Sequence, residues 1–174
     1  MFEIHTFVSY GGNGICEITD ICEKVIDQET KRFYVLRPIR GDGATIFVPV
    51  DSEVLVRRMH KLMNEEEAKY LIRCMPETEA DWVEDDRERS EQQKAILNGG
   101  DRMALVRMTK TLYERKQRLA ASGKRLRAND AQALRQGEEV LFGELAVALG
   151  IERDQVLPCI LETLSESEQT TENS

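Results

Sequence analysis

Aromatic residues, paired cysteines and long apolar runs are scarce in this sequence of 174 residues. Phe, Tyr and Trp make up 6% of the chain, and its four cysteines include no CxxC pair. No stretch approaches the roughly 18 apolar residues that a membrane-spanning helix needs, and Met1–Tyr10 lacks the apolar segment of a secretory signal. These absences argue against disulfide-rich secreted, membrane-embedded and zinc-ribbon proteins. They predict a reduced, cytoplasmic protein without a metal or cofactor.

Charged residues are abundant but unevenly distributed along the sequence. The net charge is −8, yet residues 99–127 hold nine basic and two acidic side chains, while residues 77–98 hold three basic and eight acidic ones. The basic members are Arg102, Arg107, Lys110, Arg115, Lys116, Arg118, Lys124, Arg125 and Arg127. Two interpretations stay open: a solvated helix face balanced by its acidic neighbours, or a surface for nucleic acid.

The first third of the chain alternates β-prone runs with turn residues. Gly11–Gly14 leads into a strand and lacks the spacing of a phosphate-binding loop, which indicates a hairpin turn. Pro49 removes a backbone donor, so its strand should lie at an edge of the sheet. The pattern predicts a small antiparallel β domain of the Tudor or SH3 type, with strands at 6–10, 15–21, 32–36 and 45–50.

The remainder has the spacing of helices. Asn64 and Asp101 are placed as N-caps, Pro76 and Ser122-Gly123 end helices, and Asn129 is a further candidate cap. The predicted helices are 64–75, 81–98, 101–121, 129–149 and 154–164. The fold class is therefore α+β: a β domain over residues 1–60, a helical bundle over 61–164, and a polar tail over 165–174 that we expect to be disordered.

The second predicted helix is unusual. The single tryptophan, Trp82, is followed by Val83 and then by ten polar residues, 84–93. A helix without an apolar stripe has no face to bury, so it should be solvated or meet a partner. Trp82, at its start, should therefore be semi-exposed.

Several short motifs follow one another in a defined order along the two halves of the chain. In the first half they are Val8-Ser9-Tyr10, Gly14-Ile15, Ile18, Tyr34-Val35-Leu36 and Val48-Pro49-Val50. In the second half they are Met75-Pro76, Trp82, Arg89, Ile96-Leu97, Gly100-Asp101, Leu112-Tyr113 and Glu144-Leu145-Ala146. In this order and spacing the sequence resembles the CarD/CdnL family of bacterial transcription regulators, from about residue 3 to residue 164.

The resemblance implies a function for each half. The β domain would dock on the β subunit of RNA polymerase, edge strand against edge strand. The candidate polymerase-binding residues are Lys24, Arg32, Arg37, Thr45, Ile46, Phe47, Val48 and Pro49. The helical domain would contact promoter DNA at the upstream edge of the transcription bubble, with Trp82 as a minor-groove wedge that slows bubble collapse. The candidate DNA-binding residues are Trp82, Arg87, Arg89, Lys110, Lys124 and Arg125.

The residues next to Trp82 modify this expectation. Glu84, Asp85 and Asp86 would repel phosphate, so we expect weak DNA affinity alone, with polymerase docking supplying the effective concentration. We expect the protein to act as a monomer.

Two rival functions remain. An enzyme would need a nucleophile and a base, and the spacings of His5, His60, Cys16 and Cys22 fit no catalytic template. An adaptor that binds polymerase without touching DNA would use the acidic segment 77–98 to recruit a partner. The basic segment 99–127 and Trp82 favour the DNA-binding interpretation.

Overall fold

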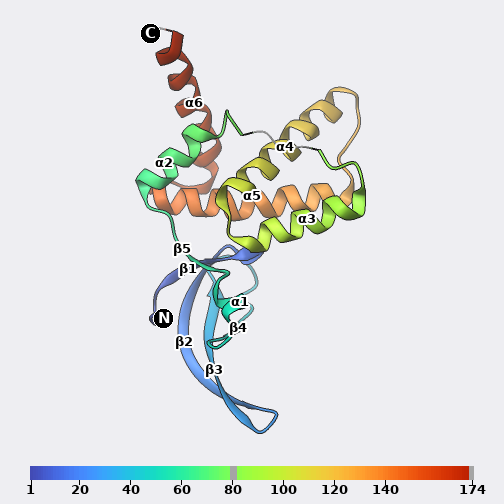
Figure 1. The fold of residues 1–174 in the computed structure, drawn as a ribbon. Helices are drawn as coiled ribbons and strands as arrows, with labels where there is room; N and C mark the ends of the chain where they lie inside the picture. Colours follow the sequence, from blue (N-terminus) through green and yellow to red (C-terminus); the bar gives the residue numbers. More distant parts are fainter. Residues whose placement is uncertain (79–81, 173–174) are drawn as a thin grey trace.

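The computed structural model describes residues 1–78 and 82–172, which form an N-terminal sheet and a C-terminal group of helices (Figure 1). The N-terminal elements are β1 (Phe7–Tyr10), η1 (Gly11–Asn13), β2 (Ile15–Ile26), β3 (Glu29–Pro38), β4 (Ile46–Pro49), α1 (Glu53–Val56) and β5 (Met59–Lys61). The C-terminal elements are α2 (Glu65–Cys74), α3 (Asp86–Gly99), α4 (Arg102–Ala121), α5 (Ala128–Leu149), η2 (Arg153–Gln155) and α6 (Val156–Glu172). This order confirms the predicted α+β class.

The sheet is antiparallel in the order β4-β3-β2-β1-β5, which leaves β4 and β5 as its two edges. The hairpin of β2 and β3 is longer than predicted and projects from the domain (Figure 1). Its tight turn is Asp27-Gln28, with φ of 52° and 65°. Two positive φ values suit the twist of a hairpin, but they are usually supplied by Asn or Gly. The turn therefore has no Gly or Asn to mark it in the sequence. The strand pattern also did not predict β5.

A small core lies on one face of the sheet. Its buried members are Val8, Tyr10, Cys16, Ile18, Tyr34, Leu36, Val48 and Met59. Alternate residues of a strand face the same side, so β1, β2 and β3 each contribute every second side chain. Of the residues between them, Ser9, Ile15 and Phe33 are also buried, so the second face of the sheet is partly covered.

The helix caps confirm two predicted starts. Asn64 accepts a hydrogen bond from the Glu67 amide, while the Glu67 carboxylate accepts one from the Asn64 amide. Asp101 accepts a hydrogen bond from the Ala104 amide at the start of α4. Each cap satisfies amides that the first helical turn leaves without partners.

Three predicted boundaries differ. The cap of α3 is Asp85, so the helix begins at Asp86 and Trp82 precedes it; Asp81, the predicted start, lies outside the described residues. Helix α5 begins at Ala128, with Arg127 as its N-cap in place of Asn129. Helix α6 continues to Glu172, although disorder was predicted from residue 165. Neither Gly nor Pro follows residue 158 to end that helix.

Helix α3 does bury a face, which corrects the expectation of a solvated helix. Arg89, Gln93 and Leu97 are 7%, 6% and 7% exposed. Two of the three are polar, so hydrophobic periodicity could not reveal this face. The buried face packs beside α4 and α5, which run across the helical domain (Figure 1).

The helical core draws on α2, α4, α5 and α6. Its largest fully buried side chains are Ile72, Leu112, Leu145 and Val156. Among the described helices, none combines the length and the apolar character that crossing a membrane requires.

The two domains meet through specific polar and steric contacts. Arg102 donates from Nη2 to the Lys61 carbonyl at 2.6 Å and from Nε to the Glu144 carboxylate at 2.9 Å. Glu144, whose side chain is 4% exposed, also accepts the Met63 amide at 3.1 Å. One buried carboxylate on α5 therefore joins α4 to the segment that leaves the sheet.

Candidate functional site

Two guanidinium groups lie over the ring of Trp82. The Cζ atom of Arg89 is 4.4 Å from the ring centroid, and that of Arg115 is 3.8 Å from it. The ring also packs partly against the helical core, and its Nε1 is buried without a hydrogen-bond partner among the described residues. Cations at this distance over an indole are attracted by the ring quadrupole. We call Trp82, Arg89 and Arg115 the tryptophan site.

Arg89 belongs to a buried polar network. Its Nε and Nη2 atoms donate to the two carboxylate oxygens of Asp130, each at 2.9 Å, and Gln93 donates to the same carboxylate at 2.8 Å. Burial raises the pKa of Asp130, but the hydrogen bonds from Arg89 and Gln93 and the charges of Arg89 and Arg115 outweigh it and leave the pKa below its ordinary value. The carboxylate is therefore ionised at neutral pH and holds Arg89 in place.

This network corrects the assignment of Arg89 to DNA contact. A guanidinium that is 7% exposed and bonded on both edges has no donor directed at solvent. In the sequence Arg89 lies within an acidic, polar helix, and nothing there indicates that Asp130, 41 residues away, would meet it.

Lys110 is also hydrogen-bonded within the fold, and this corrects its assignment to DNA contact. Its Nζ donates to the carbonyls of Met75, Pro76 and Thr78 at 3.1, 3.1 and 2.9 Å. These carbonyls follow the end of α2, where a helix leaves acceptors unsatisfied and favours a cation. All three ammonium protons are thus engaged at the end of α2.

A basic surface surrounds the tryptophan site. One surface cavity beside Trp82 is also lined by Arg115 and Arg125, and a second is lined by Arg115 and Arg118. Arg118, Lys124 and Arg125 are exposed, and no carboxylate among the described residues pairs with them. We use the name basic surface for Arg115, Arg118, Lys124 and Arg125.

Lys124 and Arg125 were in the predicted DNA-binding set, whereas Arg115 and Arg118 were not singled out. A signal for Arg115 was available. Leu105, Met108 and Leu112 are buried on α4, and Arg115 continues the same helical face three residues later. Arg87, also in the predicted set, is exposed and pairs with Glu91 at 3.2 Å.

The acidic residues after Trp82 are largely engaged. Asp85 caps α3 by accepting the Glu88 amide at 2.8 Å, and Asp86 pairs with Arg89 at 2.6 Å and with Arg127. Glu84 is exposed and lines the same cavity as Arg125. The expected repulsion of phosphate by three carboxylates therefore reduces mainly to that of Glu84.

The β4 edge forms the second candidate surface. The Val50 amide donates to the Arg32 carbonyl at 2.9 Å. Hydrogen-bonded positions alternate along an antiparallel pair, so Phe47 directs its backbone groups to the open edge, whereas the Pro49 carbonyl accepts the Ser52 amide at 3.2 Å. Because Pro49 has no N–H, the Phe47 amide is the only donor that β4 offers there.

The predicted polymerase-binding residues at this edge differ in how exposed they are. Phe47 is 41% exposed, and the Nζ atom of Lys24 lies 3.2 Å from its ring centroid. Arg32, Arg37 and Thr45 are exposed, whereas Ile46 and Pro49 are half-buried. Val48 is 0% exposed and belongs to the core, which corrects its assignment as a contact residue.

The cysteine chemistry argues against a catalytic thiol in the sheet. Burial raises the pKa of Cys16 to about 11, and its Sγ donates to the Gly14 carbonyl. The thiol is therefore protonated at neutral pH, and a thiol is a weak nucleophile compared with the thiolate. Within residues 1–78 and 82–172, no group of three or more His, Cys, Asp or Glu side chains is arranged to hold a metal ion.

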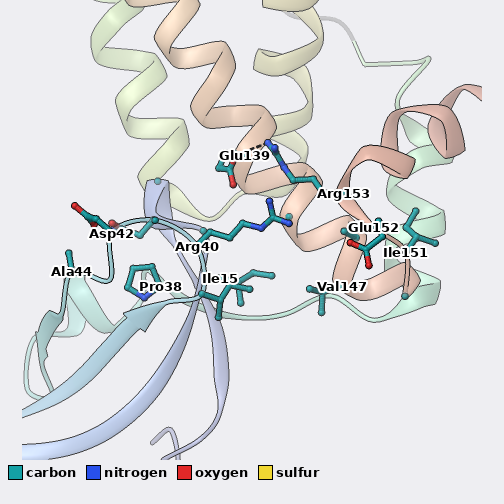
Figure 2. Close-up of a pocket in the computed structure, with 18 residues that line it drawn as sticks. Ile15, Pro38, Arg40, Asp42, Ala44, Glu139, Val147, Ile151, Glu152 and Arg153 are labelled. Carbon is teal, nitrogen blue, oxygen red and sulfur yellow. Dashed lines mark ion pairs between the residues drawn. The ribbon is translucent and has the colours of Figure 1, made fainter.

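A cavity of about 590 Å³ lies at the domain junction. Figure 2 shows Arg40 reaching from the loop after β3 toward α5, where Arg153 and Glu139 form an ion pair at 2.7 Å. Apolar walls come from Ile15 and Val147. The cavity is shared by both domains, and neither the tryptophan site nor the β4 edge lines it.

The described chain thus combines an antiparallel sheet that has β4 at one edge with a group of helices that carry exposed cations near Trp82. Residues 2–60 match the family described as the CarD-like/TRCF RID domain, and this part of the chain is a CarD-like RNA polymerase-interacting domain. CarD and TRCF RID domains bind the β subunit of RNA polymerase, and the family's members are generally non-catalytic regulators. No curated protein matches the sequence.

Proposed function

We propose that the chain is a transcription regulator that docks on the RNA polymerase β subunit and contacts promoter DNA at the upstream edge of the bubble. Contact there changes the lifetime of the open complex. The β domain, residues 1–60, supplies docking, and the helical part from residue 61 supplies the DNA contact. The observation that carries the proposal is the basic surface around Trp82, on the helical part of a chain whose first 60 residues contain a polymerase-interacting domain.

Docking through the β4 edge follows from its backbone. An edge strand presents unpaired groups that another strand can use, and the cation and ring of Lys24 and Phe47 flank this edge. Pairing at a single strand with one free donor gives directional but modest affinity.

DNA contact follows from the cations. Arg118 and Arg125 are exposed and line cavities beside Trp82, and the exposed Lys124 precedes Arg125 in the chain. Cations on such a surface bind phosphates without reading sequence. Trp82 can add apolar contact at a distorted step, where minor-groove proteins place such side chains. Arg87, predicted from the sequence, stays a proposed contact at the exposed face of α3.

An adaptor without DNA contact is the second candidate. The exposed side of α3 carries Glu88 and Glu91, and the exposed Glu84 precedes the helix; these carboxylates would repel phosphate and could bind a basic protein. This alternative predicts that promoter DNA makes no difference to how the protein binds polymerase.

The experiment compares open complexes with and without the protein. We expect footprinting to show protection at the upstream bubble edge. We also expect replacement of Arg118, Lys124 and Arg125 by Ser to flatten the salt dependence of promoter engagement by roughly one unit of log–log slope for each phosphate that is no longer bound. Arg73→Ser, which removes one exposed arginine from α2, controls for the loss of a cation away from the basic surface. Unchanged protection and slope in the triple variant, with polymerase binding intact, would favour the adaptor.

A further inference from the structure

The two arginines that lie over the ring of Trp82 differ in character. Arg89 is buried and bonded to several acceptors, whereas Arg115 is half-buried and, among the described residues, pairs with no carboxylate. We propose that Arg89 is the positioning residue for Trp82: it fixes the indole for DNA contact while touching no DNA itself. The functional consequence of this proposal rests on the DNA contact proposed above, but the positioning itself does not.

Arg89 holds both the ring and the backbone of the tryptophan segment. Its Nη1 donates to the Val83 carbonyl at 2.7 Å and to the Glu84 carbonyl at 3.3 Å, the two residues that follow Trp82. The Cζ atom of the same guanidinium lies over the indole, 4.4 Å from its centroid. One side chain thus restrains the main chain just after Trp82 and the plane of its ring.

The network behind Arg89 makes this restraint rigid. Both carboxylate oxygens of Asp130 accept hydrogen bonds from the guanidinium, and Asp86 accepts a further one at 2.6 Å. A planar guanidinium that is bonded on several edges cannot rotate without breaking several charge-assisted hydrogen bonds. The tryptophan segment is therefore anchored to the first turn of α5, far away in sequence.

Arg115 also lies over the indole but has no comparable bonds. A phosphate that approaches the basic surface would attract this guanidinium, and its departure would uncover the part of the indole that it covers. Arg89 would meanwhile keep the ring plane fixed, so little side-chain entropy would be lost on contact. Arginine at position 89 is required for this role, because lysine has neither the fork nor the planar stacking surface.

The single tryptophan makes the positioning measurable without DNA. In the full chain, Arg89→Lys should lower the fluorescence anisotropy of the indole and raise its accessibility to acrylamide. The ratio of packed to free indole should fall about fivefold, which corresponds to removing a cation–π interaction of about 1 kcal/mol. Arg73→Lys should leave both values unchanged. Anisotropy and quenching equal to the control in Arg89→Lys would overturn the proposal.

A second variant covers the case in which Arg89→Lys fails to fold. Asp86→Asn removes one bond from Arg89 at a half-exposed carboxylate, with the Asp130 pair intact. It should shift anisotropy and quenching in the same direction by a smaller amount. No shift in a folded Asp86→Asn protein, when Arg89→Lys is unfolded, would count against the proposal.

A double-mutant cycle on open-complex half-life separates positioning from the proposed function. Arg89→Lys should shorten the half-life in the native background and have no further effect in a Trp82→Ala background. If Trp82→Ala leaves the half-life unchanged, the proposed DNA contact is wrong, while the fluorescence result still decides the positioning. Equal shortening by Arg89→Lys in both backgrounds would show that Arg89 acts on DNA without Trp82, and would overturn the proposal.

Discussion

At the scale of single residues, the most consequential side chains are charged groups that the fold has buried. Arg89, Asp130 and Glu144 are each less than a tenth exposed, and each has a partner from a different helix or from the chain that leaves the sheet. Replacing a buried ion pair by apolar residues can be neutral, whereas removing one partner leaves an unpaired charge and costs far more. Such residues are thus sensitive probes of the structure.

Asp130 gives a prediction for the pH dependence of stability. Its folded pKa is lowered, so its contribution is fully present above the unfolded value of about 3.9 and is lost as the pH falls through the lower folded pKa. Asp130→Asn should lower the free energy of unfolding at neutral pH by roughly 3–5 kcal/mol. Its stability should also fall less steeply below about pH 4 than that of the native protein. Urea unfolding across pH measures both, and Asp154→Asn, an exposed site, is the control. An unchanged acid limb would contradict the prediction.

Gly100 gives a prediction about the domain junction. Its φ is +75°, and a Cβ there would overlap the ring of His60. Gly123 has φ +69° with nothing within 4 Å of the same position, so it isolates the backbone effect. Gly123→Ala should cost about 1–2 kcal/mol for the left-handed conformation alone, and Gly100→Ala should cost clearly more in thermal melting. Equal losses would mean that His60 moves aside freely.

At the scale of elements, the open edge of β4 is defined by its register. The backbone groups of Pro49 and Phe47 point away from β3, and the Val50 amide donates to the Arg32 carbonyl of β3. An edge with one amide donor limits pairing to a short segment of a partner strand. This arrangement makes the backbone and side-chain contributions of Phe47 separable.

Phe47→Pro should lower polymerase affinity roughly tenfold, because it removes the outward amide while leaving the pairing of β3 with β4 intact. Phe47→Ala keeps the amide and removes only the ring that Lys24 covers, so it should cost less. Binding of the full chain to polymerase, with thermal melting as a check on the fold, compares the two. If alanine costs as much as proline, the ring rather than the backbone carries the contact.

At the scale of the whole molecule, the junction fixes how the sheet and the helices are joined. Arg102 bonds to the Lys61 carbonyl and to Glu144, and Glu144 holds the Met63 amide. This buried carboxylate is therefore one of the links between the sheet and the helices.

Arg102→Met should leave Glu144 buried without its cation and lower the free energy of unfolding by roughly 3–5 kcal/mol. Because the coupling between domains weakens, calorimetry should show two separated transitions instead of one. Arg107→Met, an exposed arginine on the same helix, serves as the comparison. A single transition at an unchanged temperature would show that the domains are coupled by other contacts.

Local rules in the sequence predicted much of the fold. The caps at Asn64 and Asp101 are confirmed because a cap needs only residues three positions apart. The strand alternation also located β1, β2 and β3. The Asp27-Gln28 turn was missed because its positive φ values are held by the long hairpin and have no Gly or Asn to mark them.

The sequence by itself determined the class of the fold, most element boundaries and the position of a basic segment, residues 99–127, after the acidic segment that contains Trp82. Only the tertiary structure brought Arg115, Arg118 and Arg125 to the tryptophan and decided which cations are available. Lys110 looks equivalent to Arg118 and Arg125 along the chain, yet packing brings three carbonyls to it, as it brings Asp130 to Arg89 of the acidic segment. Charge is a property of the residue, but its partners come from elements tens of residues away, and only the packing of helices sets which cations remain exposed.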